Sequence, residues 1–390
     1  MKRVLYCIRT LLAMAFLLSG WLKVNDPIGM ALKTEEYAAA LGVGPLPLMA
    51  EIVAGAALGT LEFTLGASLV AGLHQRLTYV VVLLFMAVMT AVTVWLAVVN
   101  PVSDCGCFGD MLILSHGASL AKNLVLLAMS VALMRWGAGL GSAAGRGEAW
   151  MLSLPIMLAC MAYAAWCVYT LPKADFRPYY VGADLGALRA GGGGGYDVKI
   201  VYRRGDETLL LEADDEDPDS TWTYVETRST PRRDTAQGSS RWMPGITTWL
   251  SHRGDVADLW AIDENGEDRA DDILSEPGYT LLVTIPRMGT ADESCAGPIN
   301  LLYDLAQETG TPFHCLCAAD STARLHWTEY TGAEYGYLLA DERTLWTMVR
   351  SNPGLILLKD GVVQRKWSSW NIDQAQAYME QRIGTIHLTP

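Results

Sequence analysis

The amino-acid sequence predicts an α-helical membrane bundle of about five transmembrane helices, followed by a β-rich segment and an α/β domain. Two observations carry this prediction. Residues 1–171 are dominated by Leu, Ala, Val, Met and Gly and have few charges, whereas residues 172–390 hold most of the acidic groups. The first part also contains long apolar segments, and the second part alternates short strand-like runs with amphipathic helical ones.

Five apolar segments are long enough to cross a bilayer as a helix, which takes about 20 residues. They lie near residues 4–22, 49–73, 77–99, 119–138 and 149–171. Lys2 and Arg3 precede the first segment, as they would in a signal peptide, but no small-x-small cleavage site follows it. We therefore expect an uncleaved membrane anchor.

The positions of Lys and Arg set the expected orientation, because these residues collect in cytoplasmic loops. With the N-terminus inside, the cytoplasmic side holds Lys2, Arg3, Arg9, Arg76, Arg135 and Arg146. The opposite loops hold Lys23 and Lys33, and loop 101–117 holds neither Lys nor Arg. Five crossings then place residues 172–390 outside the cytoplasm.

The formal net charge of −13 belongs mainly to the second half and argues against nucleic-acid binding, which needs a positive surface. The most acidic run comprises Asp214, Asp215, Glu216, Asp217 and Asp219. Its oxygens could bind Ca²⁺, but their spacing matches no calcium loop, so a solvated turn is the simpler interpretation. We expect the lipid bilayer, and no nucleic acid, as a partner.

Small residues in the second apolar segment predict a helix inside the bundle. Gly55 and Gly59 are four residues apart, a spacing that lets helix backbones approach closely. Glu62 falls near the middle of the same segment, where an ionisable group is costly unless it pairs or lines a cavity. Two interpretations stay open: a protonated carboxyl hydrogen-bonded to a neighbouring helix, or a proton- or quinone-linked site.

The loop after the third segment contains two thiols in the run Asp104-Cys105-Gly106-Cys107-Phe108-Gly109-Asp110. Cys105 and Cys107 can close a small disulfide ring, because the glycines release backbone constraints. Such a ring is strained, and strained exposed disulfides are the reducible kind. An extracytoplasmic location permits disulfides. Three interpretations stay open: a redox-active pair, a static structural disulfide, and a metal site with His116 or Asp104.

Three stretches resemble the DoxX/MauE-like family of membrane proteins: residues 19–37, LEFTLG at 61–66 and DCGCFGD at 104–110. The first is similar to the DoxX pattern of Ser-Gly, Lys, Asp-Pro and Tyr, present here as Ser19, Gly20, Lys23, Asp26, Pro27 and Tyr37. The Cys-Gly-Cys-Phe-Gly stretch is similar to MauE. This resemblance covers about the first 170 residues. It implies a bacterial inner-membrane protein in a redox context, either quinol-linked oxidation or maturation of a disulfide-rich periplasmic enzyme.

The run Phe176-Arg177-Pro178-Tyr179, followed by Gly182, resembles the exit segment of a DoxX-like group from Bacteroidetes with a C-terminal soluble extension. Its aromatic residues and Arg177 suit the headgroup level of a membrane. We therefore divide the chain into a membrane domain at 1–172 and a linker at 173–195, whose last five residues are glycines.

The soluble half divides into two predicted pieces. Residues 196–277 are β-rich, with a hairpin around Gly205-Asp206 and a further strand at 220–230. Residues 278–390 alternate strands and helices, and Asp360-Gly361 is a strong turn signal inside a hairpin at 354–368. The other strands are predicted at 280–286, 312–317 and 336–340, and the helices at 295–310, 321–331, 341–350 and 371–383.

This order of elements, with Pro353 just before the hairpin, resembles a thioredoxin-like domain, which carries a proline, usually cis, beside its active site. The resemblance implies Cys-x-x-Cys where the first strand meets the first helix. The chain reads Ser294-Cys295-Ala296-Gly297-Pro298 there, so at most one thiol remains. Cys295 could be nucleophilic through the helix dipole, or the domain could be degenerate and non-catalytic. Cys315 and Cys317 share one face of a predicted core strand and are expected to be buried structural residues.

Two functions compete. In the first, Cys105 and Cys107 cycle between dithiol and disulfide and exchange electrons with a membrane quinone and a periplasmic thiol protein, with Cys295 as an internal relay partner. In the second, the protein is a non-enzymatic membrane anchor or assembly factor whose degenerate domain holds a periplasmic partner. We favour the redox function because an exposed Cys-x-Cys loop makes a poor structural staple.

Overall fold

A computed structural model describes most of the 390 residues, namely 2–44, 46–102, 105–112, 114–142, 145, 148–192, 196–205, 207–212, 221–231, 256 and 259–386. The acidic run at 214–219, the metal candidate Asp104 and the glycines at 193–195 lie outside the described residues. The chain forms two compact units. Unit 1 comprises Met1–Val168 with Pro172–Ala174, and unit 2 comprises Tyr169–Leu171 with Asp175–Pro390.

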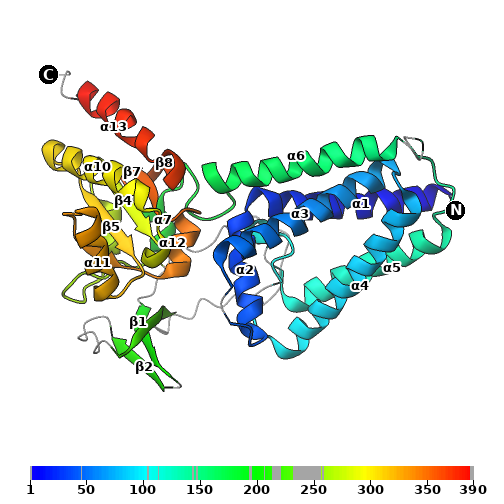
Figure 1. Ribbon diagram of the computed structural model, residues 1–390, viewed down its shortest axis with the longest axis horizontal. Coiled ribbons are helices and arrows are strands. Elements are labelled where there is room, and N and C mark those ends of the chain that lie inside the picture. The colour runs from blue at the N-terminus through cyan, green and yellow to red at the C-terminus, as the bar shows by residue number, and fades with distance from the viewer. Residues whose placement is uncertain are drawn as a thin grey trace. The chain divides into compact units, whose positions relative to one another are not determined.

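Unit 1 is helical (Figure 1). Its helices are α1 (Lys2–Asn25), α2 (Pro27–Ala40), α3 (Leu48–Ala71), α4 (Gln75–Val99), α5 (His116–Trp136) and α6 (Ala149–Thr170). All of these except α2 are long and apolar enough to cross a membrane, which confirms the prediction of five spans. The sequence reasoning missed α2, although Asp26 and Pro27 form a typical helix start: the Asp26 carboxylate accepts a hydrogen bond from the Gly29 amide at 2.9 Å.

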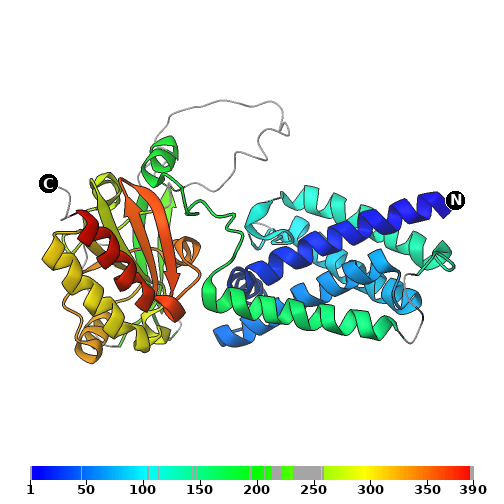
Figure 2. The same cartoon turned by 90° about the horizontal axis from the view of Figure 1, so that it is seen from above.

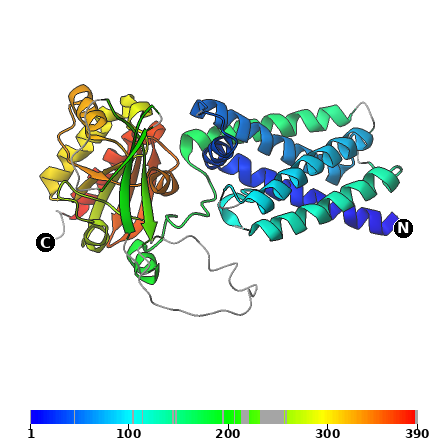
Figure 3. The same cartoon turned by 90° about the horizontal axis from the view of Figure 1, so that it is seen from below.

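Helix α3 is the central helix of unit 1. Half of its apolar window is buried, compared with one third or less in the other four spans. It packs along α1, while α4 packs along α5, as Figure 3 shows from below. The prediction that the helix with Gly55 and Gly59 lies inside the bundle is therefore confirmed: both glycines are buried.

Unit 2 contains a small antiparallel sheet in the order β2-β1-β3. Strand β1 (Tyr196–Arg204) is joined to β2 (Glu207–Glu212) through Gly205, and β3 (Thr223–Pro231) pairs with the other edge of β1. The backbone of Gly205 has φ +60°, in the left-handed region that glycine adopts at little cost. The predicted hairpin and strand are both present.

A second sheet is mixed and has the order β6-β5-β4-β7-β8. Strands β4, β5 and β6 run parallel, and β7 and β8 are antiparallel to their neighbours. The strands are β4 (Tyr279–Ile285), β5 (Phe313–Cys317), β6 (Tyr337–Leu339), β7 (Gly354–Lys359) and β8 (Val362–Ser368). The helices of unit 2 are α7 (Leu185–Gly192), α9 (Ala270–Ser275), α10 (Ala296–Thr309), α11 (Ser321–Thr331), α12 (Glu342–Met348) and α13 (Asp373–Ile386). The 3-10 turns of the chain are η1 (Gly109–Met111), η3 (Met288–Thr290), η4 (Glu293–Cys295) and η5 (Ser369–Asn371).

Helices cover both faces of this sheet. Figure 2 shows α10 and α13 side by side on one face, where they pack on alternate strand residues such as Val283 and Leu355. On the other face, Leu282 and Ile356 pack against α9 and α12. Strands β4 and β7 therefore place successive side chains in two separate cores, which explains their nearly continuous apolar sequences.

Candidate functional site

The Cys-Gly-Cys loop is closed by a disulfide. Cys105 and Cys107 are bonded to each other, and Gly106 between them has φ +63°, a conformation that favours glycine. The expectation of an exposed loop is wrong: Cys105 is 8% exposed and Cys107 is 9% exposed. They pack with Leu96 at the end of α4.

Helix α2 also contacts this loop, which is one reason for its burial. The Tyr37 hydroxyl donates a hydrogen bond to the Cys105 carbonyl oxygen at 3.0 Å. A Cβ added to Gly106 would lie 3.4 Å from the Cγ of Lys33, so the Lys33 side chain lies against the loop. The Lys33 ammonium itself pairs with Glu36 at 2.9 Å. The missed helix therefore shields the disulfide.

A buried ion pair joins α1 and α3 directly beside the loop. The Lys23 Nζ lies 2.8 Å from Glu62 Oε2, and both side chains are 3% exposed. The ammonium also donates to Ser19 Oγ at 2.7 Å and to the Cys107 carbonyl oxygen at 3.1 Å. Its three N–H donors therefore have three acceptors, which is the condition for a buried charge to be tolerated. The Ser19 hydroxyl donates to the same carbonyl at 2.8 Å.

This arrangement answers part of the question about Glu62. The carboxyl is indeed bonded to a neighbouring helix, but its partner is a lysine. We had assigned Lys23 to an outer loop, whereas it lies buried in the last turn of α1. Ser19 and Lys23 are four residues apart on one helix face, a signal that could have placed both near Glu62.

Glycines make the contact between α1 and α3 close. A Cβ on Gly59 would lie 2.7 Å from the Lys23 Cβ, and a Cβ on Gly20 would lie 2.3 Å from the Phe63 backbone nitrogen. No side chain fits at either position without moving a helix. The Ser19-Gly20 pair therefore supplies both a hydroxyl for the cluster and the space that brings the lysine to the carboxylate.

A cavity of about 40 Å³ lies beside the ion pair. This space has room for about three waters, at roughly 10–15 Å³ each. Its polar lining comprises Ser19, Lys23, Glu62, Lys122 and Asn123, with Cys107 at one side and Phe and Met side chains elsewhere.

Lys122 of α5 is the second cation of the cavity. Its Nζ lies 4.5 Å from the centre of the Phe108 ring, and the described residues offer it no carboxylate partner. A cation–π contact is worth about 0.5–2 kcal/mol, whereas a charged side chain deep in a membrane costs roughly 2.5–3.5 kcal/mol or more. The cavity thus holds two ammonium groups and one carboxylate. Sequence reasoning did not single out Lys122.

The metal interpretation gains no support among the described residues, where no group of three or more His, Cys, Asp or Glu side chains could hold an ion. His116 is the first residue of α5, and Asp104 is outside the described part of the chain.

Cys295 of unit 2 is buried in the domain core. It is 2% exposed, and its Sγ contacts the Ser369 carbonyl oxygen at 3.2 Å. Burial, followed by the charge of Asp292, raises the pKa of the Cys295 thiol to about 12. This direction is opposite to the acidic thiol that a helix N-terminus alone would produce.

The remaining cysteines of this domain are core residues. Cys315 and Cys317 are fully buried and pack in the same cluster, which confirms the expected burial on one face of β5. Burial raises the pKa of both thiols, and that of Cys317 reaches about 12.

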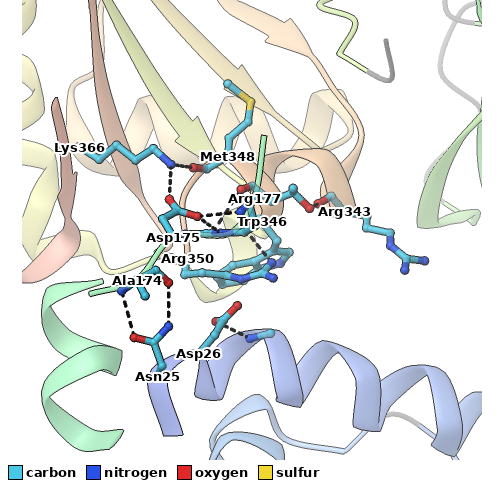
Figure 4. Close-up of polar contacts among 12 residues, drawn as sticks. Asn25, Asp26, Ala174, Asp175, Arg177, Arg343, Trp346, Met348, Arg350 and Lys366 are labelled. Carbon is cyan, nitrogen blue, oxygen red and sulfur yellow. Dashed lines mark hydrogen bonds and ion pairs between the residues drawn. The ribbon is translucent and has the colours of Figure 1, made fainter. Parts of the chain in front are cut away.

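The second buried charge cluster lies at the start of unit 2 (Figure 4). Asp175 lies between Arg177 and Lys366, with N–O distances of 2.7 and 2.9 Å. Arg177 and Lys366 also donate to backbone carbonyls at the C-terminal end of α12, where cations are favourable. Burial alone would raise the pKa of Asp175, but the charges of Arg177 and Lys366 lower it to about 2. Burial, followed by the charge of Arg177, lowers the pKa of Lys366 to about 7.

This cluster corrects the expectation for Arg177. We had assigned Arg177 to the membrane headgroup level, but it is 3% exposed and paired inside unit 2. The sequence showed the residue type, and only the fold brings Lys366, 191 positions away from Asp175, to the same carboxylate.

Comparison with known proteins bears on unit 1. Residues 1–136 match the family described as methylamine utilisation protein MauE. No curated protein matches the chain. The matched stretch includes α1 to α5 and the disulfide loop, and so contains all the polar residues that line the cavity beside Lys23 and Glu62. Residues 1–136 of this multi-pass membrane protein therefore form a MauE family domain, of the DoxX-like kind.

Proposed function

We propose that unit 1 is a membrane thiol–disulfide exchange unit whose reactive pair is Cys105 and Cys107. The observation that carries the proposal is the position of this disulfide beside a polar cavity with an ammonium, a carboxylate and a hydroxyl. A static staple needs none of these groups, whereas dithiol chemistry must move two protons. The cavity has space for the waters that would carry them.

The exchange proceeds in two steps. A thiolate of a periplasmic partner attacks one sulfur of the Cys105–Cys107 bond, and the other sulfur leaves as a thiolate that takes up a proton. A second thiolate of the partner then attacks the mixed disulfide and releases the second cysteine of the loop. The partner leaves with a new disulfide, and the pair has gained two electrons and two protons. A membrane quinone would supply the oxidant for the return to the disulfide, by accepting those two electrons and two protons.

The residues of the cluster have defined tasks in this cycle. Lys23 and Ser19 both donate to the Cys107 carbonyl oxygen, so they hold the loop in place while its sulfurs separate. Glu62 orients the Lys23 ammonium through the contact of 2.8 Å. The ammonium of Lys122 is the donor that would hold a quinone carbonyl oxygen at the cavity, because the Asn123 amide already donates to Met89 and Thr93.

We further infer that residues 278–390 are a thioredoxin-like domain that binds the partner and performs no thiol chemistry. The sheet order β5-β4-β7-β8 supports this fold. The burial of Cys295 and its high pKa argue against the internal relay that the sequence had allowed. The distribution of Lys and Arg supports a periplasmic position for this domain and an inner-membrane location.

The second candidate is a non-enzymatic anchor or assembly factor. One observation favours it: both sulfurs of the loop are covered by α2 and α4, as a structural disulfide would be. In this case the disulfide holds the loop against Lys23, and unit 2 binds the client. For the thiol–disulfide exchange function, the same burial means that α2 must move before a partner thiol can reach either sulfur.

Thiol trapping on the full-length protein in native membranes separates the two candidates. The exchange unit predicts that dithiothreitol frees two thiols at Cys105 and Cys107 in the folded protein, and that a soluble quinone reoxidises them with one quinol formed per pair. Cys105→Ser and Cys107→Ser should each abolish quinol formation, whereas Cys160→Ser in α6 should not. A disulfide that resists reduction until the protein unfolds, or a dithiol that the quinone leaves reduced, would overturn the exchange function and favour the assembly factor.

A further inference from the structure

We propose that Lys122 is a positioning residue that holds the thiolate formed at Cys107 when the disulfide opens. The inference rests on the proposed exchange function and adds an asymmetry to it, because it selects Cys107 as the sulfur that carries the negative charge. Both residues line the same cavity.

The charges of the cavity carry the inference. Lys23 and Glu62 neutralise each other at 2.8 Å, and Lys23 has all its donors occupied. Lys122 is then the cation of the cavity that has no direct ion-pair contact among the described residues, and its Nζ lies over the Phe108 ring. Among the described residues that line it, the cavity in the disulfide form therefore carries two ammonium groups and one carboxylate. Cleavage of the disulfide creates a negatively charged thiolate at Cys107, next to Phe108 in the sequence. This thiolate balances the positive charge of Lys122.

The other helices around the loop do not offer a competing cation. Helix α2 supplies Lys33, whose ammonium is occupied by Glu36, and α4 supplies apolar contacts through Leu96 and Trp95. The charged groups around the loop include Lys23 on α1, Lys33 and Glu36 on α2, Glu62 on α3 and Lys122 on α5, and the loop itself contributes Asp110 in η1. Of these, Lys122 has a flexible side chain and no ion-pair partner, so it can follow a sulfur that moves.

A consequence is that the reduced form gains stability from Lys122. A thiolate held by an ammonium is a better leaving group, so the attack of a partner thiolate falls preferentially on Cys105 and expels Cys107. The lysine therefore sets the direction in which the disulfide opens as well as the ease of its reduction.

The test measures the alkylation rate of Cys107 against pH in full-length protein that carries Cys105→Ser. With Lys122 present, the rate should reach half its maximum below about pH 7.5, compared with the ordinary thiol value of about 8.5. Lys122→Met should shift this midpoint upward by at least about one pH unit, which is roughly a tenfold lower rate at pH 7. Lys122→Arg should retain most of the effect, because it keeps the charge.

Lys33→Met is the matched control, since Lys33 lies against the same loop but pairs with Glu36. It should leave the midpoint unchanged. Equal midpoints for Lys122→Met and the parent, in proteins that both still form the Cys105–Cys107 disulfide when Cys105 is restored, would overturn the inference. Failure of the exchange function has a different signature: the quinone does not reoxidise the pair, whatever the midpoint of Cys107.

Discussion

The buried pair of Lys23 and Glu62 allows a quantitative test of how unit 1 is held together. Both side chains are 3% exposed and 2.8 Å apart, so removing either partner leaves a buried charge without compensation. Such a loss costs about 3–5 kcal/mol, whereas replacing both partners by apolar residues of similar volume is close to neutral. We expect Lys23→Met and Glu62→Met each to destabilise α1 and α3 by about 3–5 kcal/mol, and the double variant by about 1 kcal/mol or less.

The double-mutant cycle isolates the pair from the other contacts of the lysine. Lys23→Met also removes the donor to Cys107, but that carbonyl keeps its bond from Ser19 at 2.8 Å. The same loss occurs in the double variant and cancels in the coupling energy. The measurement is hydrogen exchange of peptides from α1 and α3 in full-length protein, with β4 peptides of unit 2 as the internal reference. A coupling below about 1 kcal/mol would refute the reasoning and show that the pair contributes no more than an exposed one.

Three further predictions concern other parts of the chain. Because the pKa of Asp175 is lowered to about 2, its stabilising contribution is complete above about pH 4 and lost as the pH falls toward 2. Hydrogen exchange of β8 should then show a loss of about 2 kcal/mol over this range that Asp175→Asn lacks. Gly20→Ala should destabilise unit 1 by about 1–3 kcal/mol in detergent unfolding, because the added Cβ would lie 2.3 Å from a backbone nitrogen of α3. Gly117→Ala is the control: its Cβ would meet open space, so the variant should be neutral or stabilising. Cys295 should resist alkylation at pH 8 until the protein is denatured, because at a pKa of about 12 only about one molecule in 10⁴ carries the thiolate. Rapid labelling of Cys295 in the folded protein would contradict its burial.

The long apolar helices and the alternating strands were predictable from the sequence, whereas the short helix α2 was not. The five membrane spans and the strands of unit 2 were placed within a few residues, because apolar length and alternation depend on local composition alone. Helix α2 was missed because its 14 residues are too short and too polar to register as a span. Its start is set by the Asp26 cap and Pro27, features that act over a single turn.

The candidate site shows the same division. That Cys105 and Cys107 can close a disulfide was foreseeable from their spacing and from Gly106 between them, but the sequence left a metal site open as well. Their burial was not, because it depends on α2 and α4 packing over them. The partner of Glu62 was missed because Lys23 is 39 positions away in the sequence. The role of Arg177 was misjudged because its ion-pair partner, the Asp175 carboxylate, is shared with Lys366 from β8.

The sequence alone determined that this chain has a helical membrane part with a Cys-Gly-Cys loop and a mixed α/β part with one thiol at the start of a helix. These features follow from hydrophobic length, periodicity and close spacing, which need no knowledge of distant contacts. The tertiary structure decided which charges meet and which thiols are buried. Buried ion pairs and cavities form between helices that are far apart in the sequence, and their energies arise only when packing removes both partners from water.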